Sequence, residues 1–124
     1  MKITAVIQCR MASTRLPGKV MTKFYDHPCI GWIVDACERS RGINNIVVAT
    51  STNPENDVIA KWCEDHWTDV FRGDEDDVIS RYIGLIDKYQ SDAVVRLTGD
   101  CIFADSHVIS QVVALFKATG VDYA

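Results

Sequence analysis

Short apolar runs alternate with longer amphipathic stretches along the 124-residue chain. Apolar runs of about five residues bounded by polar or glycine-containing segments are typical of buried strands, whereas apolar residues spaced roughly three or four positions apart indicate one face of a helix. These patterns predict four strands that alternate with four helices. The predicted strands are 3–7, 45–49, 69–71 and 93–97, and the predicted helices are 29–41, 54–67, 76–89 and 106–119.

Individual residues indicate where several of these helices begin and end. Pro54 is suited to the first turn of the second helix, and Ser106 is a suitable N-cap for the fourth. Gly42 and Gly120 follow the last apolar positions of their helices, where a left-handed residue commonly ends a helix. The acidic run 74–77 lies at the start of the third helix, where the helix macrodipole stabilises negative charge. We interpret this run as a helix start rather than a metal site.

Strict alternation of strands and helices predicts a single α/β domain spanning residues 1–124, with a mostly parallel sheet covered on both faces. Right-handed crossovers favour a doubly wound strand order of 3-2-1-4. In that order the first and fourth strands are neighbours, and the winding direction reverses between them. Ligands bind outside the carboxyl ends of the strands at such a point. The segments 8–19 and 98–101 are therefore expected to share one crevice.

The net charge of −4 conceals an uneven distribution. Up to Arg41 there are seven basic and three acidic residues, whereas from Gly42 onward there are six basic and fourteen acidic residues. No acid precedes Asp26, so the segment after the first strand is cationic without local compensation. A small polyanion is the expected partner. The acidic remainder argues against long nucleic acids, which require a broad basic surface.

The remaining bulk features favour a soluble cytoplasmic protein without membrane contact. No apolar run approaches the roughly 20 residues that span a bilayer, and residues 1–3 lack the features of a signal peptide. The five cysteines are not spaced as CxxC, which argues against structural zinc. In a reducing compartment we interpret them as small buried apolar residues.

The segment 8–19 combines residue types that bind triphosphates. Arginine pairs with phosphate oxygens through two donors, lysine acts as a mobile point charge, and hydroxyls and backbone N–H groups add uncharged donors. The alternative is a solvated surface loop with scattered charges, which leaves the absence of acids unexplained. The cations are Arg10, Arg15 and Lys19, the hydroxyl residues are Ser13 and Thr14, and Pro17-Gly18 is expected to form a tight turn with exposed N–H groups.

Two standard phosphate-binding motifs are absent from the sequence. Gly18-Lys19 is followed by Val20 and lacks the earlier glycine of a P-loop, and there is no GxGxxG. P-loop ATPases and Rossmann dehydrogenases are therefore disfavoured. Asp100 lies after the fourth predicted strand, where a carboxylate could bind Mg²⁺ that phosphates already chelate. The alternative is that Asp100 only caps a turn after Gly99.

Four segments carry a resemblance to a known family. The run 7–20 closely resembles the signature at the start of the cytidylyltransferases that activate 3-deoxy-manno-octulosonate and acylneuraminate, and the spore-coat polysaccharide branch is the nearest likeness. The segments 49–54, 72–78 and 95–101 resemble the same branch. The resemblance covers essentially the whole chain. It implies a Rossmann-like fold of the nucleotide-diphospho-sugar transferase type.

The resemblance also implies a reaction. A sugar acid or related sugar attacks the α-phosphate of CTP, which releases pyrophosphate and leaves a CMP-sugar for surface or spore-coat polysaccharide. Arg10, Arg15 and Lys19 would be the catalytic cations, and Asp100 would bind Mg²⁺. Arg96 lies within the fourth strand and is interpreted as structural. The nucleotide-binding residues implied are Gln8, Arg10, Ser13, Arg15, Lys19, Thr50, Ser51, Arg81 and Thr98.

Two features set this chain apart from the family pattern. Cys9 stands where alanine is usual, a change expected to be harmless at a buried position. Family members also extend well beyond residue 124, and their later half supplies much of the sugar pocket and the dimer contacts. We therefore interpret residues 1–124 as the N-terminal part of the family fold, truncated after the fourth strand–helix unit, with a homodimer as one assembly that the resemblance leaves open.

Two other functions remain as alternatives to the enzyme. The first is a nucleotide or nucleotide-sugar binding module that is weakly active or inactive because the later half is absent. The second is a glycosyltransferase that uses a nucleotide-sugar donor. That class commonly has an Asp-x-Asp pair at this strand exit, whereas Asp100-Cys101-Ile102 offers one acid. The glycosyltransferase hypothesis is the weaker of the two.

Overall fold

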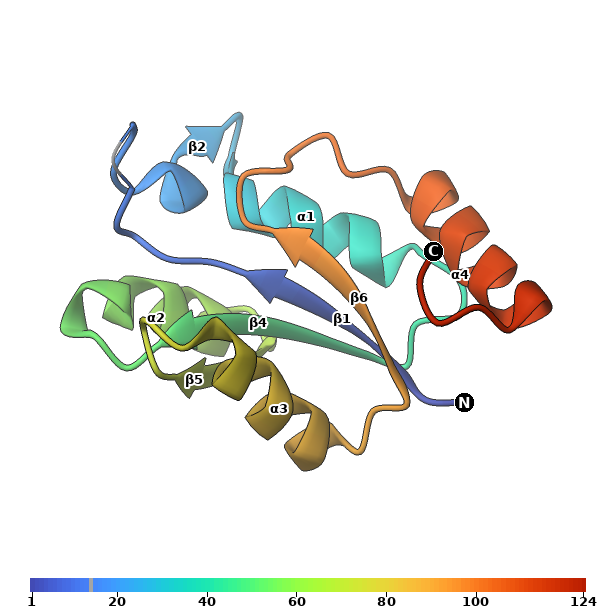
Figure 1. Ribbon diagram of the computed structural model, residues 1–124. Coiled ribbons are helices and arrows are strands. Elements are labelled where there is room, and N and C mark those ends of the chain that lie inside the picture. Colours follow the sequence, from blue (N-terminus) through green and yellow to red (C-terminus); the bar gives the residue numbers. More distant parts are fainter. Residues whose placement is uncertain (14) are drawn as a thin grey trace.

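Four parallel strands form the central sheet of the computed structural model, which describes residues 1–13 and 15–124 (Figure 1). Thr14, one of the two hydroxyl residues predicted to bind phosphate, lies outside the described residues. The strand order β5-β4-β1-β6 confirms the predicted order 3-2-1-4. The strands of this sheet are β1 (Ile3–Gln8), β4 (Asn45–Ser51), β5 (Asp69–Gly73) and β6 (Ala93–Thr98).

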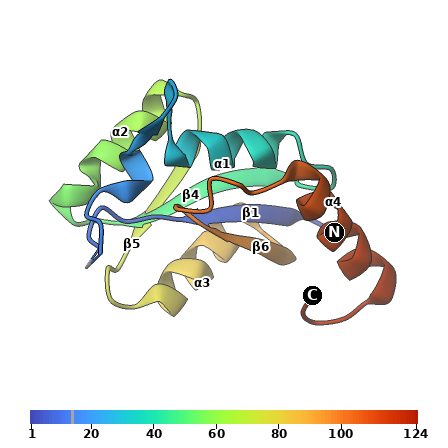
Figure 2. The ribbon, with the colours of Figure 1, turned by 90° about the horizontal axis from the view of Figure 1, so that it is seen from above.

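Helices cover both faces of this sheet, as predicted. Figure 2 shows α3 on one side of the strands and α1 and α2 on the other. The apolar cores follow the same division, because residues of α1, α2 and α4 share one cluster and residues of α3 belong to a second. The helices are α1 (Cys29–Glu38), α2 (Asp57–Asp65), α3 (Val78–Tyr89) and α4 (Ser106–Thr119), with short 3-10 turns η1 (Lys19–Met21) and η2 (Pro54–Asn56).

The register of the sheet brings the ends of its strands to one edge. Gln8 at the end of β1 is opposite Ala49 in β4 and Thr98 in β6. The ladder continues past the strand ends, because Cys9 N donates to Ala49 O at 2.9 Å and Gly99 N donates to Gln8 O at 2.9 Å. The segments that leave β1 and β6 therefore begin side by side.

Several predicted element ends differ from the structure. The first helix ends at Glu38 rather than Arg41, because the chain turns there and Arg41 N donates to Ser110 Oγ in α4 at 2.8 Å. The fourth helix is capped by Asp105, whose carboxylate accepts from His107 N at 2.7 Å, so the predicted Ser106 cap is wrong. The second and third helices also proved shorter than predicted, spanning 57–65 after the 3-10 turn and 78–89.

The sequence pattern missed a small antiparallel hairpin between the basic segment and α1. Its strands, β2 (Lys23–Phe24) and β3 (His27–Pro28), are too short to produce an alternating pattern. Trp32 in α1 holds the hairpin by donating from Nε1 to Phe24 O at 2.9 Å. The hairpin thus ties the far end of the basic segment to α1.

The cysteines are mostly buried, as predicted, with one clear exception. Cys9, Cys37 and Cys63 are buried, and burial raises the pKa of the Cys63 thiol to about 12 and that of Cys37 to about 11. Cys29 is half-buried, whereas Cys101 is exposed at the exit of β6, so the buried interpretation is wrong there. Within the described residues, no helix combines the length and apolar character needed to cross a membrane.

Two glycines in left-handed conformation allow a matched test of packing between α1 and α4. Gly42 has φ of 86°, and a Cβ there would lie 2.8 Å from Val113 Cγ1, whereas Gly120 has φ of 65° and open space around it. We expect Gly120→Ala to lower the free energy of unfolding by roughly 1 kcal/mol through backbone strain alone. Gly42→Ala adds a clash with a buried side chain and should cost at least about 2 kcal/mol. Equal losses in urea unfolding would contradict this packing.

Candidate functional site

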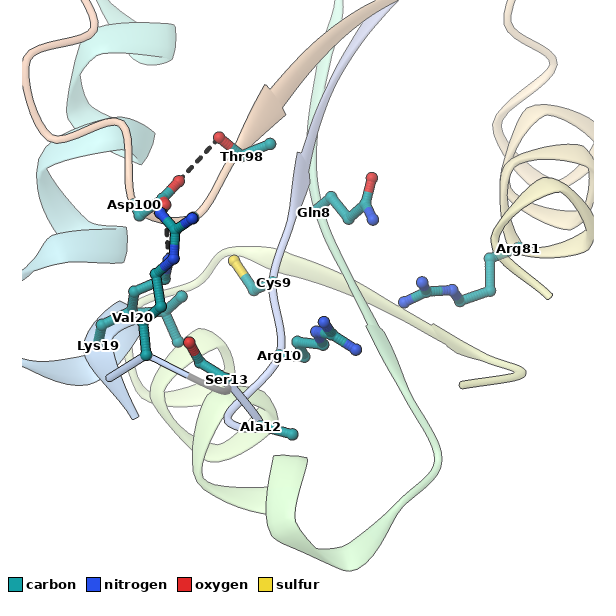
Figure 3. A pocket seen from close by; sticks show the side chains of 12 residues that line it. Gln8, Cys9, Arg10, Ala12, Ser13, Lys19, Val20, Arg81, Thr98 and Asp100 are labelled. Atoms are coloured by element: carbon teal, nitrogen blue, oxygen red, sulfur yellow. Dashed lines mark hydrogen bonds and ion pairs between the residues drawn. The ribbon is translucent and has the colours of Figure 1, made fainter. Parts of the chain in front are cut away.

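A cavity of about 410 Å³ lies where the chain leaves β1 and β6. Figure 3 shows its lining side chains arriving from the basic segment, from the exit of β6 and from α3. Its volume falls within the range of small-ligand pockets. The lining residues are Gln8, Cys9, Arg10, Ala12, Ser13, Arg15, Lys19, Val20, Arg81, Thr98, Gly99 and Asp100.

An ion pair joins the two predicted segments across this cavity. Lys19 Nζ lies 2.8 Å from Asp100 Oδ2, and Thr98 Oγ1 donates to Asp100 Oδ1 at 2.9 Å. The hydrogen bond from Lys19 and then that from Thr98 hold the pKa of Asp100 below its ordinary value. Asp100 is therefore ionised at neutral pH. Both side chains of the pair remain partly open to solvent, at 36% for Lys19 and 45% for Asp100, so an incoming ligand can reach them.

Three arginines at the cavity differ from Lys19 in forming no ion pair with the described acidic residues. Within residues 1–13 and 15–124, no carboxylate lies within 4.0 Å of the guanidinium of Arg10, Arg15 or Arg81. Such a group of cations without close ion pairs favours an anion with several charges. The lining of the cavity is thus suited to an anion, and the polyanion partner stays a prediction.

Arg81 reaches the cavity from α3 while its side chain stays almost entirely buried, at 5% exposure. Its Nε has no hydrogen-bond acceptor among the described residues. Gly73 makes the approach possible, because a Cβ there would lie 2.5 Å from Arg81 Cγ. A buried donor without an acceptor costs stability, and the Nε of Arg81 is closed to solvent.

The basic segment is held by its own backbone and by one buried side chain. Gly18, at φ of 73°, donates from its N–H to Met11 O at 2.7 Å, and Lys19 N donates to Leu16 O at 3.3 Å. The prediction that the Pro17-Gly18 turn exposes N–H groups is therefore wrong, since the loop itself uses that of Gly18. The donors that face the cavity are chiefly side chains.

Asn56 is a site-supporting residue that the sequence analysis missed. It is fully buried, accepts from Met11 N at 2.8 Å and donates to Ser51 Oγ at 2.6 Å. Its Nδ2 also lies 3.3 Å from Glu75 Oε2. One amide thus ties the start of the basic segment to the end of β4. An asparagine after Pro-Glu is typical of a helix start, so the sequence did not indicate that Asn56 bonds Met11 and Ser51.

Not every predicted binding residue reaches the cavity. Thr50 and Ser51 do not line it, because Thr50 is fully buried and Ser51 Oγ is engaged by Asn56. Arg96, interpreted as structural rather than as a binding residue, is exposed on β6 and lies outside the lining. The predicted residues that the cavity does bring together are Gln8, Arg10, Ser13, Arg15, Lys19, Arg81, Thr98 and Asp100.

The acidic run 74–77 stabilises the start of α3. Asp74 accepts from the N–H groups of Asp76 and Asp77, both at 2.8 Å, and these bonds hold its pKa below the ordinary value. Asp77 caps the helix by accepting from Ser80 N at 3.0 Å. Elsewhere too, the described residues contain no group of three His, Cys, Asp or Glu side chains arranged around a metal position.

Comparison with known proteins gives consistent results. A family model described as cytidylyltransferase matches residues 4–124. The spore coat polysaccharide biosynthesis protein SpsF of Bacillus subtilis is 32% identical over 125 residues, covering 98% of this chain and 52% of that protein. The chain spans about half the length of the curated relatives it matches.

Solved structures share the fold as well. A cytidylyltransferase from Leptospira borgpetersenii superposes with a TM-score of 0.90 at 37% identity, covering 96% of this chain and 50% of that one. A CMP:2-keto-3-deoxy-manno-octonic acid synthetase solved with CTP gives a TM-score of 0.84 at 20% identity, covering 98% of this chain and 49% of that one. The second likeness shows the fold alone.

The ion pair can be tested by titrating Asp100 in NMR spectra. Its carboxyl should titrate below the ordinary value of about 3.9. Because its pKa is lowered in the folded state, its contribution to stability is present above that value and is lost as the pH falls through the folded pKa. Lys19→Met should raise the Asp100 pKa more than Thr98→Val, because the lysine is the larger cause. No change in either variant would contradict the pairing.

The role of Asn56 can be tested by truncation. Asn56→Ala leaves Met11 N and Ser51 Oγ without their buried partner, so we expect the free energy of unfolding to fall by about 1–3 kcal/mol. The exposed Asn53, three positions earlier, supplies the control. Asn53→Ala should change stability by no more than about 0.5 kcal/mol. Hydrogen exchange at the Met11 amide should accelerate only in the Asn56 variant, and unchanged protection would refute the tether.

Proposed function

The chain belongs to the cytidylyltransferase family, and on that premise we propose that its cavity binds CTP with Mg²⁺ and that the protein transfers CMP to a sugar acid or related sugar. Pyrophosphate is the second product. The observation that carries this proposal is the 2.8 Å pair between Lys19 and Asp100. The pair places Lys19, which can bind phosphate, beside Asp100, which can bind the metal ion that phosphate oxygens also coordinate.

The triphosphate is assigned to the cations of the basic segment. Arg10 and Arg15 have guanidinium groups without acidic partners among the described residues, and each can pair with phosphate oxygens through two donors. Ser13 Oγ accepts from Leu16 N at 3.3 Å, which leaves its own proton for a phosphate oxygen. Lys19 exchanges Asp100 for phosphate when the nucleotide enters.

The single carboxylate of Asp100 suits Mg²⁺, which phosphate oxygens also coordinate, better than a metal ion whose ligands all come from the protein. Magnesium keeps several waters and commonly takes one or two carboxylates together with phosphate oxygens. Asp100 is ionised, and one of its oxygens is held by Thr98 while the other is paired with a displaceable lysine. When bound there, the ion would neutralise phosphate charge and orient the triphosphate.

The catalytic contribution of the chain is electrostatic. As the sugar oxygen attacks the α-phosphate, negative charge accumulates on the departing pyrophosphate. Fixed cations aimed at that charge lower the barrier without reorganising during the reaction. Arg10, Arg15 and Lys19 line the cavity in that role. Loss of one such donor typically slows an enzyme by about 10²–10³-fold.

The relatives support the substrate classes. The name of SpsF refers to spore coat polysaccharide biosynthesis, and the Leptospira structure at 37% identity is named a cytidylyltransferase. Because this chain spans about half the length of such relatives, the sugar-binding part of the activity is proposed for the whole protein. The nucleotide-binding part is proposed for residues 1–124.

Nucleotide binding can be tested by thermal stabilisation with CTP and Mg²⁺. At about 100 times the dissociation constant the stability gain should be roughly 2.7 kcal/mol. Arg15→Ala and Lys19→Ala should remove most of this gain, and Asp100→Asn should remove its dependence on Mg²⁺. Lys23→Ala is the control, because Lys23 lies on β2 outside the cavity lining.

The outcomes separate the functions. If the first three variants respond like the wild type, the site assignment fails. A measurement of pyrophosphate release with a panel of sugar acids then distinguishes an enzyme from a binding module. Stabilisation by CTP without pyrophosphate release would favour the binding module for this chain.

A further inference from the structure

The side-chain amide of Gln8 is held in one orientation by two donors. Tyr82 OH donates to Gln8 Oε1 at 3.1 Å, and Arg96 Nε donates to the same oxygen at 3.3 Å. An arginine Nε is a donor and never an acceptor, so the atom facing it must be the amide oxygen. The amide nitrogen of Gln8 therefore lies on the opposite side.

Both donors are placed by the fold. In the register of the two strands, Arg96 of β6 lies opposite Val6 of β1, and Thr98 lies opposite Gln8. Residues two positions apart on a strand point to the same face of the sheet, so Arg96 and Gln8 project from the same face. Tyr82 comes from α3 and packs on the core of that face. Burial is the main cause that raises the pKa of Tyr82, so its hydroxyl keeps the proton it donates.

The free side of the amide faces the α3 end of the cavity. Figure 3 shows the Gln8 nitrogen on the side of Arg81, with its oxygen turned away from that side chain. Arg81 lines the cavity with a guanidinium group that can only donate. The side chains at this end therefore present hydrogen-bond donors. Lys19 and Asp100 form the opposite end, where the metal and phosphates are assigned.

A nucleotide with its phosphates near Lys19 directs its base toward this donor-rich end. Cytosine presents acceptors at O2 and N3, whereas uracil carries a hydrogen at N3. A fixed amide NH₂ beside position 3 pairs with cytosine and meets another donor in uracil. A site built to satisfy one pattern rejects the other, because buried polar groups are left unpaired.

We propose that Gln8 selects cytosine over uracil by donating to the base edge, and that Tyr82 and Arg96 are positioning residues that prevent its amide from turning over. This inference rests on the proposed function, since it requires a nucleotide in the cavity. The Gln8 amide would thus distinguish the two bases, while Tyr82 and Arg96, which lie outside the cavity lining, fix its orientation.

The experiment measures dissociation constants of Mg²⁺–CTP and Mg²⁺–UTP by calorimetry for each variant. The wild type should bind CTP at least about tenfold more tightly than UTP. Gln8→Met removes the donor and should bring the ratio close to one. Gln8→Glu places an acceptor there and should shift the ratio toward UTP. Both nucleotides carry the same phosphates, so the ratio is insensitive to a general loss of anion binding.

The positioning role is tested by the double variant Tyr82→Phe/Arg96→Met. It leaves Gln8 in place but frees the amide to present either atom, so the preference for CTP should fall to within about twofold. Tyr89→Phe, another α3 tyrosine outside the cavity lining, should keep the wild-type ratio. A double variant with unchanged selectivity would overturn the positioning role.

The two proposals fail in different ways. If the wild type binds neither nucleotide, the proposed function fails with this inference. If the wild type binds CTP and UTP equally, the inference fails while nucleotide binding stands. If Gln8→Met retains the full preference for CTP, another group reads the base.

Discussion

The parallel pairing of β1 between β4 and β6 is the constraint on which the site depends. Because parallel strands end at one edge, the basic segment and Asp100 leave the sheet as neighbours. The bond from Gly99 N to Gln8 O extends that pairing beyond the strands. Gly99 also permits a close approach, since a Cβ there would lie 2.6 Å from Cys9 Sγ. Without this packing, Lys19 and Asp100 would not meet at 2.8 Å.

Polar groups fall into two classes around this edge. Behind the cavity, Asn56 satisfies the groups of Met11 and Ser51, so the start of the basic segment is held by matched hydrogen bonds. In the cavity, cations outnumber acids, and Arg81 has a buried donor without an acceptor among the described residues. The match behind the cavity is not complete, because the buried Thr50 Oγ1 also has no partner among the described residues.

The predicted helices and strands agree with the structure where a long apolar pattern supported them. The predictions are wrong where a single local contact determines the end of an element. The four strands and the order 3-2-1-4 follow from apolar runs and right-handed crossovers. The hairpin at 23–28 has strands of two residues, which cannot show a period. The cap at Asp105 rather than Ser106 depends on which of two adjacent side chains reaches the N–H groups of α4. Sequence reasoning therefore located the helices better than their ends.

The sequence by itself determined the cationic, acid-free segment, the acid at position 100 and the alternation that puts both at one sheet edge, because residue type and period are properties of the chain alone. Only the tertiary structure decided which atoms face the cavity. In the folded chain Thr50 and Ser51 lie outside the cavity lining, and the Gly18 N–H bonds within its own loop. Asn56 holds Ser51 by a hydrogen bond, and Tyr82 fixes the orientation of the Gln8 amide. Those outcomes depend on hydrogen bonds between residues distant in sequence, for which a single sequence holds no periodic signal.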